Sequence, residues 1–100
     1  MSKTVATNRA RFQKEIERRL QCWGTRRGAL AAMLEKADDD GKASLFTELT
    51  KLTNLEAEGR RCHSAVEAVG AAAWARLQAD LVERWERVDR AAEAAWTRAK

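Results

Sequence analysis

The sequence of 100 residues contains no proline and no tyrosine, and its five glycines are isolated from one another. Without proline, nothing in it forces a long helix to break. Strands have little to form from, because β-branched residues are few. Alanine and leucine, which favour helix, supply most of the apolar content. We therefore predict an all-α fold.

Side chains that hold metals or carry out catalysis are also scarce. The soft metal ligands are Cys22, Cys62 and His63, and a structural zinc site needs four ligands. Adjacent residues on a helix point about 100° apart, so Cys62 and His63 are not a nucleophile–base pair either. There is no glycine-rich phosphate loop, and the acidic residues are scattered along the chain. The sequence predicts no metal, no cofactor, no catalytic residue and no enzymatic activity.

No uninterrupted apolar run approaches the roughly 20 residues that span a bilayer. No signal peptide is expected, and two cysteines without one indicate a reducing compartment, which makes the cytoplasm the expected location. The net charge of +4 is uneven, since residues 1–30 carry eight Lys or Arg against two acids. The basic surface comprises Arg9, Arg11, Lys14, Arg18, Arg19, Arg26 and Arg27.

This basic surface is open to more than one interpretation. It would attract nucleic acid, an anionic membrane or an acidic partner, and equally the acidic middle of its own chain or of a second copy. Phe12 and Trp23 are better placed for a helix seam than for stacking on bases. A specific nucleic-acid site is therefore not expected.

Apolar residues at heptad spacing predict a first helix over about residues 6–37. Its seam runs in alternating steps of four and three and has one charged member, Arg27: Ile16, Leu20, Trp23, Arg27, Leu30, Leu34 and Ala37. The only concentrated helix-breaking signal follows, at Asp38-Asp39-Asp40-Gly41-Lys42. Aspartate caps a following helix and glycine stops a preceding one, so we predict a tight turn over residues 38–43.

A second heptad seam begins near Ser44, a candidate N-cap, and runs to Val69. Folding it back on the first seam gives facing pairs whose residue numbers add up to 82 or 83. In this register Trp23, the largest side chain of the first helix, faces Gly59, which has no side chain. Interdigitated packing requires such a match of large with small. We therefore predict an antiparallel helical hairpin.

Residues 71–100 contain a repeat of period 11 that begins with Trp74, Trp85 and Trp96. Eleven residues make nearly three helical turns, so the three indoles lie almost on one line. The opposite face carries acid-before-base pairs four residues apart, such as Glu83 with Arg87, which favour helix. This segment is the most secure helix that the sequence predicts.

Two architectures fit these segments. In the first, which we favour, one helix runs over about 44–98 and its uncovered tryptophan stripe requires a partner, most simply a second copy. In the second, the chain turns a corner at Gly70 and the tryptophans become the core of a three-helix bundle. Either way we expect a single helical domain over residues 1–100.

The spacing Leu20-x-x-Trp23, then Gly70-x-x-Ala73-Trp74-x-x-Leu77 and Ala94-Ala95-Trp96, resembles a group of short bacterial coiled-coil proteins with Ala-Trp-x-x-Leu repeats. The resemblance covers most of residues 12–99. It implies a fold and no function, because that group has no established activity. It also implies a break near Gly70 rather than at residues 38–41.

These observations predict a non-enzymatic coiled-coil scaffold, adaptor or chaperone-like protein that acts by helix–helix packing. The expected partners are a second copy, as a homodimer or higher oligomer, or another helical protein. The alternative is an amphipathic-helix binder of lipid or polymer surfaces that uses the stripe of Trp74, Trp85 and Trp96. The residues expected to carry the packing are Leu30, Leu34, Leu49, Leu52, Val66, Trp74, Leu77, Leu81, Trp85, Val88 and Trp96.

Overall fold

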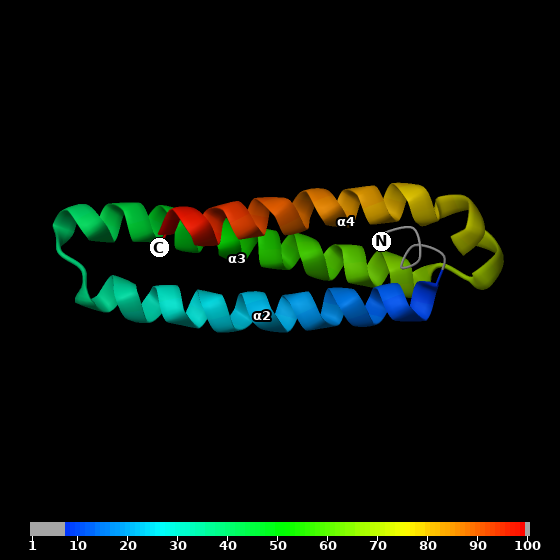
Figure 1. Ribbon diagram of the computed structural model, residues 1–100, viewed down its shortest axis with the longest axis horizontal. Helices are drawn as coiled ribbons and strands as arrows, with labels where there is room; N and C mark the ends of the chain where they lie inside the picture. The colour runs from blue at the N-terminus through cyan, green and yellow to red at the C-terminus, as the bar shows by residue number, and fades with distance from the viewer. Residues whose placement is uncertain (1–7, 100) are drawn as a thin grey trace.

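The computed structural model describes residues 8–99, and the regular structure within that range is entirely helical, as predicted. Three helices follow one another: α2 (Arg9–Lys36), α3 (Asp39–Ala68) and α4 (Ala71–Ala99). They lie side by side in a rod of 53 × 18 × 17 Å, in which α3 runs antiparallel to both α2 and α4 (Figure 1). None of them has an apolar stretch long enough to cross a membrane.

The first connection is shorter than the predicted turn over residues 38–43. Between α2 and α3 only Ala37 and Asp38 are not helical. The Asp38 side chain accepts a 2.8 Å hydrogen bond from the backbone N–H of Gly41, so the cap is Asp38 and not Ser44. Asp39 and Asp40 join the first turn of α3, where the positive end of the helix dipole stabilises carboxylates. Residues 6 and 7, where the first helix was expected to begin, lie outside the described residues.

The second connection differs from the favoured prediction of one helix over 44–98. Helix α3 ends at Ala68, Val69 takes an extended conformation (φ −83°, ψ 126°), and α4 begins at Ala71. Helix α4 then folds back along α3 instead of continuing its axis (Figure 1). The physical reason is burial, because folding back covers the tryptophan stripe with the chain's own α2 and α3. The turn lies at Gly70, where the alternative architecture and the family resemblance placed it.

The core runs along the axis of the rod and takes residues from every helix. Trp23 is fully buried, and Trp74 and Trp85 are nearly so. The buried apolar residues are Phe12, Ile16, Trp23, Leu30, Leu52, Cys62, Val66, Trp74, Val82, Trp85, Val88, Ala92 and Ala95. Two carboxylates, Glu48 and Glu56, are also buried. The stripe that seemed to require a second molecule is therefore largely internal.

Candidate functional site

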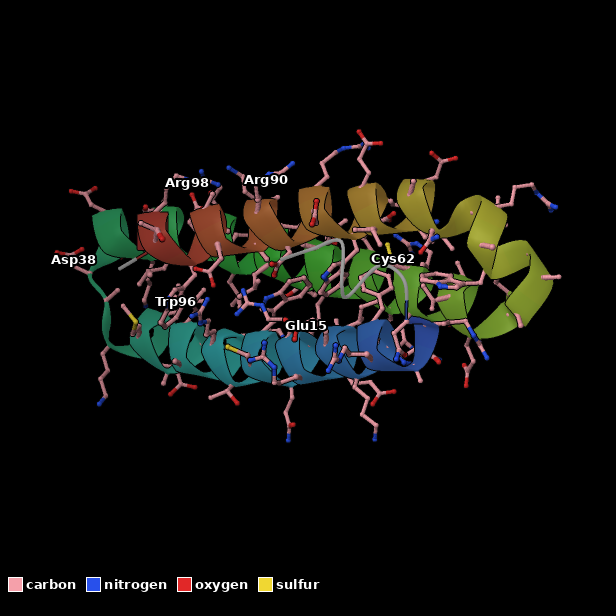
Figure 2. The ribbon with its side chains drawn as sticks, turned by 45° about the vertical axis from the view of Figure 1, so that its right-hand side comes forward. Glu15, Asp38, Cys62, Arg90, Trp96 and Arg98 are labelled. Atoms are coloured by element: carbon pink, nitrogen blue, oxygen red, sulfur yellow. The ribbon has the colours of Figure 1, made fainter. Side chains whose placement is uncertain are left out.

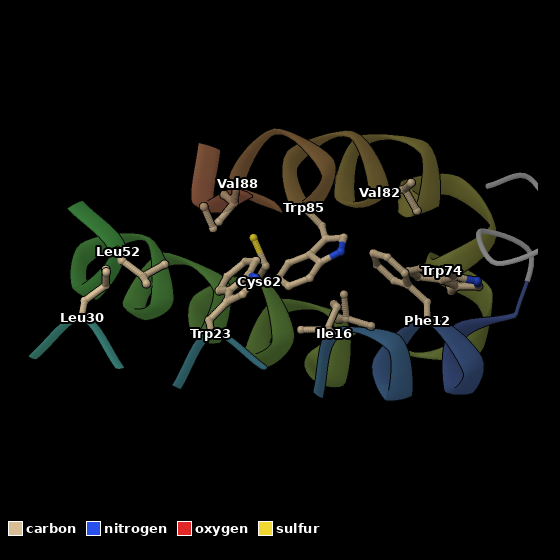
Figure 3. Packing of buried hydrophobic residues seen from close by; sticks show 12 residues of the cluster. Phe12, Ile16, Trp23, Leu30, Leu52, Cys62, Trp74, Val82, Trp85 and Val88 are labelled. Atoms are coloured by element: carbon tan, nitrogen blue, oxygen red, sulfur yellow. The ribbon is translucent and has the colours of Figure 1, made fainter. Parts of the chain in front are cut away.

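The centre of the core is a stack of two indoles built over a glycine. The rings of Trp23 and Trp85 have centroids 5.1 Å apart and are inclined by 17° (Figure 3). They meet over Gly59 of α3, where an added Cβ would lie 3.0 Å from Trp23 Cζ3 and 3.2 Å from Trp85 Cζ3. The predicted pairing of Trp23 with Gly59 is confirmed. Only glycine lets α3 approach the two rings this closely.

A second aromatic contact joins the beginning of α4 to α2. The rings of Phe12 and Trp74 have centroids 5.9 Å apart and are tilted by 34° (Figure 3). The indole nitrogens of Trp23 and Trp74 are buried and have no hydrogen-bond partner among the described residues. Both indoles therefore act here as large apolar bodies, without the polar contact that a buried indole usually makes.

Trp96, the last indole of the stripe, is half-buried and points from α4 toward α2 (Figure 2). The guanidinium carbon of Arg26 lies 5.2 Å from its ring centroid, a cation–π distance. With Trp74 and Trp85 buried, the stripe does not form an exposed apolar face. A lipid-surface role for it would require α4 to leave the other two helices.

Ion pairs bridge α2 and α4, the two helices that touch each other least. Arg19 donates to Asp89 at 2.9 Å and to Glu93 at 2.8 Å, and Arg26 donates to Glu93 as well. Burial alone would lower the pKa of Arg19, but the hydrogen bonds to Glu93 and Asp89 outweigh it and raise that pKa. The hydrogen bonds from Arg19 and Arg26 lower the pKa of Glu93. The cluster is therefore charged and closed at neutral pH.

Two buried carboxylates of α3 form ion pairs with arginines of the neighbouring helices. Glu56, 4% exposed, accepts 2.7 Å and 2.9 Å hydrogen bonds from Arg27 of α2 and Arg60 of α3. Glu48 accepts 3.3 Å hydrogen bonds from Arg98 near the end of α4. Arg27, the charged intruder in the first seam, is explained by Glu56. Heptad periodicity marks apolar positions, so it did not show that these two carboxylates would be buried against arginines.

The residues expected to carry the packing all lie at buried or half-buried positions. The buried ones are Leu30, Leu52, Val66, Trp74, Trp85 and Val88. The half-buried ones are Leu34, Leu49, Leu77, Leu81 and Trp96. Sequence periodicity did not single out Val82, which is buried although it neighbours Leu81 on the helix. These residues hold the three helices to one another.

The two cysteines and the histidine lie in different environments. Cys22 is half-buried, Cys62 is buried, and both are free thiols. His63 Nε2 lies 2.8 Å from Glu17 Oε2 across the α2–α3 interface, so the ring is engaged with a carboxylate. Burial raises the pKa of the Cys62 thiol, which makes it a poor nucleophile. Within residues 8–99 no three such groups lie close enough together to hold a metal ion.

Two shallow hollows open on the surface. One, of about 340 Å³, lies between α2 and α3 beside the His63–Glu17 pair and is floored by Leu20. The other, of about 420 Å³, lies between α3 and α4 and is lined partly by Leu55, Ala91 and Ala94. The first hollow is also lined by Ser64, but His63 Nε2 contacts Glu17, and no hydrogen bond joins the Ser64 hydroxyl to the imidazole among the described residues.

The predicted basic surface is divided by the fold. Arg19, Arg26 and Arg27 turn inward to carboxylates on other helices. Arg9 reaches the end of α3 and donates to the backbone carbonyls of Val66 (3.2 Å) and Glu67 (3.4 Å). Three of the seven cations of this surface thus pair with carboxylates on other helices of the same chain.

One end of the rod has two helices instead of three. Arg98 of α4 pairs with Glu48, so α4 reaches only that level of α3. The two-helix end, formed by residues 30–36 of α2 and 39–47 of α3, projects beyond it (Figure 1). It carries both large apolar side chains that are exposed in the described range, Met33 (38%) and Phe46 (61%). Leu34 and Leu45 beside them are half-buried.

Comparisons of the sequence with models of protein families, of the sequence with curated proteins, and of the fold with solved structures found no match.

Proposed function

We propose that this chain is a non-enzymatic coiled-coil scaffold or adaptor, whose three helices form a bundle that binds further helices by side-to-side packing. The observation that carries the proposal is the exposure of Phe46 and Met33 on the two-helix end. An added helix in the position that α4 occupies farther along would cover Met33 with the half-buried Leu34 and Leu45. Phe46 lies about 200° around α3 from Glu48, so a helix on the opposite side of α3 would cover it. Aromatic and methionine side chains are enriched at the centres of protein interfaces.

Two kinds of partner fit this end: a second copy of the chain, or a helix of another protein. Burial of apolar surface favours association by about 25 cal/mol for each Å² removed from water, and the loss of freedom on binding opposes it. A chaperone-like protein would use the same surface for a helix of its client. We expect self-association first, because a second copy is always present, and the cytoplasm as the place of action.

The test is the sedimentation of the full chain across concentrations from about 1 to 100 µM. We expect a dimer or larger species, weakened about tenfold or more by Phe46→Ser, since that change removes the exposed ring. The control is Thr47→Ser, an exposed neighbour whose change alters no apolar contact. A compact monomer throughout this range would contradict self-association.

The lipid-surface alternative predicts that tryptophan emission shifts to shorter wavelength when anionic vesicles are added. We expect no shift, because Trp23, Trp74 and Trp85 already lie in an apolar interior. A shift, accompanied by co-sedimentation of the protein with the vesicles, would favour the alternative over the scaffold.

A further inference from the structure

The connection between α3 and α4 is the least secured turn in the described chain. Helices α2 and α3 each begin with a side-chain cap, from Asn8 and Asp38. At the start of α4, Gly70 supplies only a backbone carbonyl, which accepts 2.8 Å from the N–H of Trp74. No described side chain accepts a hydrogen bond from the amides of residues 71–73. Those amides are therefore left for water.

The end of α3 is equally weakly defined. No glycine in the described range has a positive φ, so no left-handed residue stops the helix. A Cβ at Gly70 would meet nothing within 4 Å, so the fold does not need glycine there for space. At the turn itself, the side-chain contact is that of Arg9, which donates to the carbonyls of Val66 and Glu67. The turn is thus one of two conformations that the backbone can readily adopt.

The other conformation is a continuous helix. If Val69 and Gly70 became helical, the amides of residues 70–73 would donate to the carbonyls of residues 66–69. The apolar seam continues across the junction without interruption, in steps of four, three, four, four and four: Cys62, Val66, Val69, Ala73, Leu77 and Leu81. Asp39–Ala99 would then form one helix of 61 residues, about 90 Å long.

Straightening the junction removes α4 from its own α2 and α3, and a second copy can replace it without loss of contacts. In the structure, Glu58 pairs with Arg84, Glu48 pairs with Arg98, and Gly59 packs against Trp85. The residue numbers of these pairs sum to 142, 146 and 144. Two continuous helices paired antiparallel in this register keep all of these contacts, now between copies.

In that register the centre of symmetry falls at residues 71–73, where Ala72 of each copy meets its equivalent. Residues 68–73 are all alanine, valine or glycine, and four of them are exposed in the single chain: Ala68, Gly70, Ala71 and Ala72. Small side chains let two helices approach closely, and the dimer would bury this uncharged corner.

The charges that flank the corner also suit this pairing. Glu67 and Arg76 are the first charged residues on either side of it, and their numbers sum to 143. Neither forms an ion pair within residues 8–99. In the dimer each Glu67 would lie at the level of Arg76 of the second copy, an opposite-charge pair on both sides of the axis.

We propose that two copies of this chain exchange α4, giving a dimer in which α3 and α4 form one helix from Asp39 to Ala99. This exchanged dimer goes beyond the packing proposed for the two-helix end, because the exchanged α4 still reaches only the level of Glu48 and leaves Phe46 exposed. The two aromatic contacts and the α2–α4 ion pairs are rebuilt between copies. Its length is about 100 Å, roughly twice that of the single chain.

Three variants of the full chain, measured by light scattering and small-angle X-ray scattering, test the exchange. Gly70→Ala favours the continuous helix and should tighten the elongated dimer about tenfold or more. Ala71→Pro should weaken it by at least as much, because proline fits the first position of α4 but breaks a helix interior. Two glycines inserted between Gly70 and Ala71 should have the same effect as the proline and leave every native side chain in place.

Helix content and thermal midpoint will show that each variant is folded. A dimer that persists unchanged in Ala71→Pro and in the insertion variant, but is lost in Phe46→Ser, would overturn the exchange while the proposed scaffold function stands. If neither the native chain nor Gly70→Ala associates, the exchange and the proposed self-association are both overturned. A dimer with the maximum dimension of a single rod would also overturn the exchange.

Discussion

At the scale of single residues, Gly59 is the position on which the core geometry depends most. An alanine there would place its Cβ 2.9 Å from Leu20 Cδ2 and 3.0 Å from Trp23 Cζ3, distances that force these side chains to move. Overpacking of this kind costs about 1–3 kcal/mol, which exceeds the gain of about 1 kcal/mol in helix propensity. We expect Gly59→Ala to lower the free energy of unfolding in urea.

Gly28→Ala is the matched control, because it makes the same substitution inside a helix where a new Cβ meets nothing within 4 Å. Here the gain in helix propensity is unopposed, and the chain should become more stable by up to about 1 kcal/mol. If both variants shift in the same direction, the close approach of α3 to the indoles does not determine stability.

The two thiols should differ in reactivity. Cys62 is buried and burial raises its pKa, whereas Cys22 is half-buried. In native buffer at mildly alkaline pH, we expect a thiol reagent to label Cys22 about tenfold faster or more, since Cys62 must wait for an opening of the helices. The single-thiol variants Cys22→Ser and Cys62→Ser separate the two rates, and equal rates in the folded state would contradict the packing around Cys62.

At the scale of helices, the described fold follows from the sequence in some places and not in others. The pairing of α2 with α3 was predictable because large and small residues alternate across two seams, and Trp23 opposite Gly59 sets their register. The turn at Asp38 was predicted at the right place, but the predicted range of residues 38–43 is longer than the two non-helical residues observed. Ser44 resembled a cap, yet the aspartates supply a cap and two favourable charges several residues earlier.

The break at Gly70 could not be deduced in the same way. Local helix propensity hardly favours a turn over a continuous helix at Gly70, because alanines follow it and the apolar seam continues across it. The burial of Trp74 and Trp85 against the other helices favours the turn over the continuous helix. This burial depends on residues far apart in the sequence, so the local sequence around Gly70 does not reveal it. The inward-facing arginines were missed for a related reason, because heptad periodicity marks apolar positions and does not show which carboxylates α3 offers.

The cap at Asp38 gives a prediction on the stability of α3. Asp38→Ala removes the acceptor for the Gly41 amide and should cost about 1 kcal/mol. Asp40→Ala, two residues along, removes only a charge near the helix terminus and should cost a few tenths of a kcal/mol. Urea titration of the two variants measures the difference, and equal costs would show that charge and not capping defines the start of α3.

At the scale of the whole molecule, the three helices are joined unevenly. Helix α3 packs extensively against both of its neighbours, whereas α2 and α4 meet over the two indoles and the ion pairs of Arg19 and Arg26. These ion pairs therefore close the side of the rod that apolar packing covers least. An exchange of α4 between copies must open this same side.

This arrangement predicts acid sensitivity with a definite sign. Hydrogen bonds from Arg19 and then Arg26 lower the pKa of Glu93 below its ordinary value of 4.5, so the folded chain binds this proton less readily than the unfolded chain. The stabilisation is present above about pH 4.5 and is lost as the pH falls through the folded pKa. The free energy of unfolding, measured in urea from pH 7 downward, should fall across this range.

Glu93→Gln isolates that contribution, because the amide keeps the size of the side chain and does not titrate. The variant should be less stable than the native chain at pH 7, and the difference should shrink as the pH falls below 4.5. Glu83→Gln, an exposed carboxylate of α4 beside Arg87, is the control and should change little at any pH. A constant difference between Glu93→Gln and the native chain would mean that the ionisation of Glu93 does not stabilise the contact between α2 and α4.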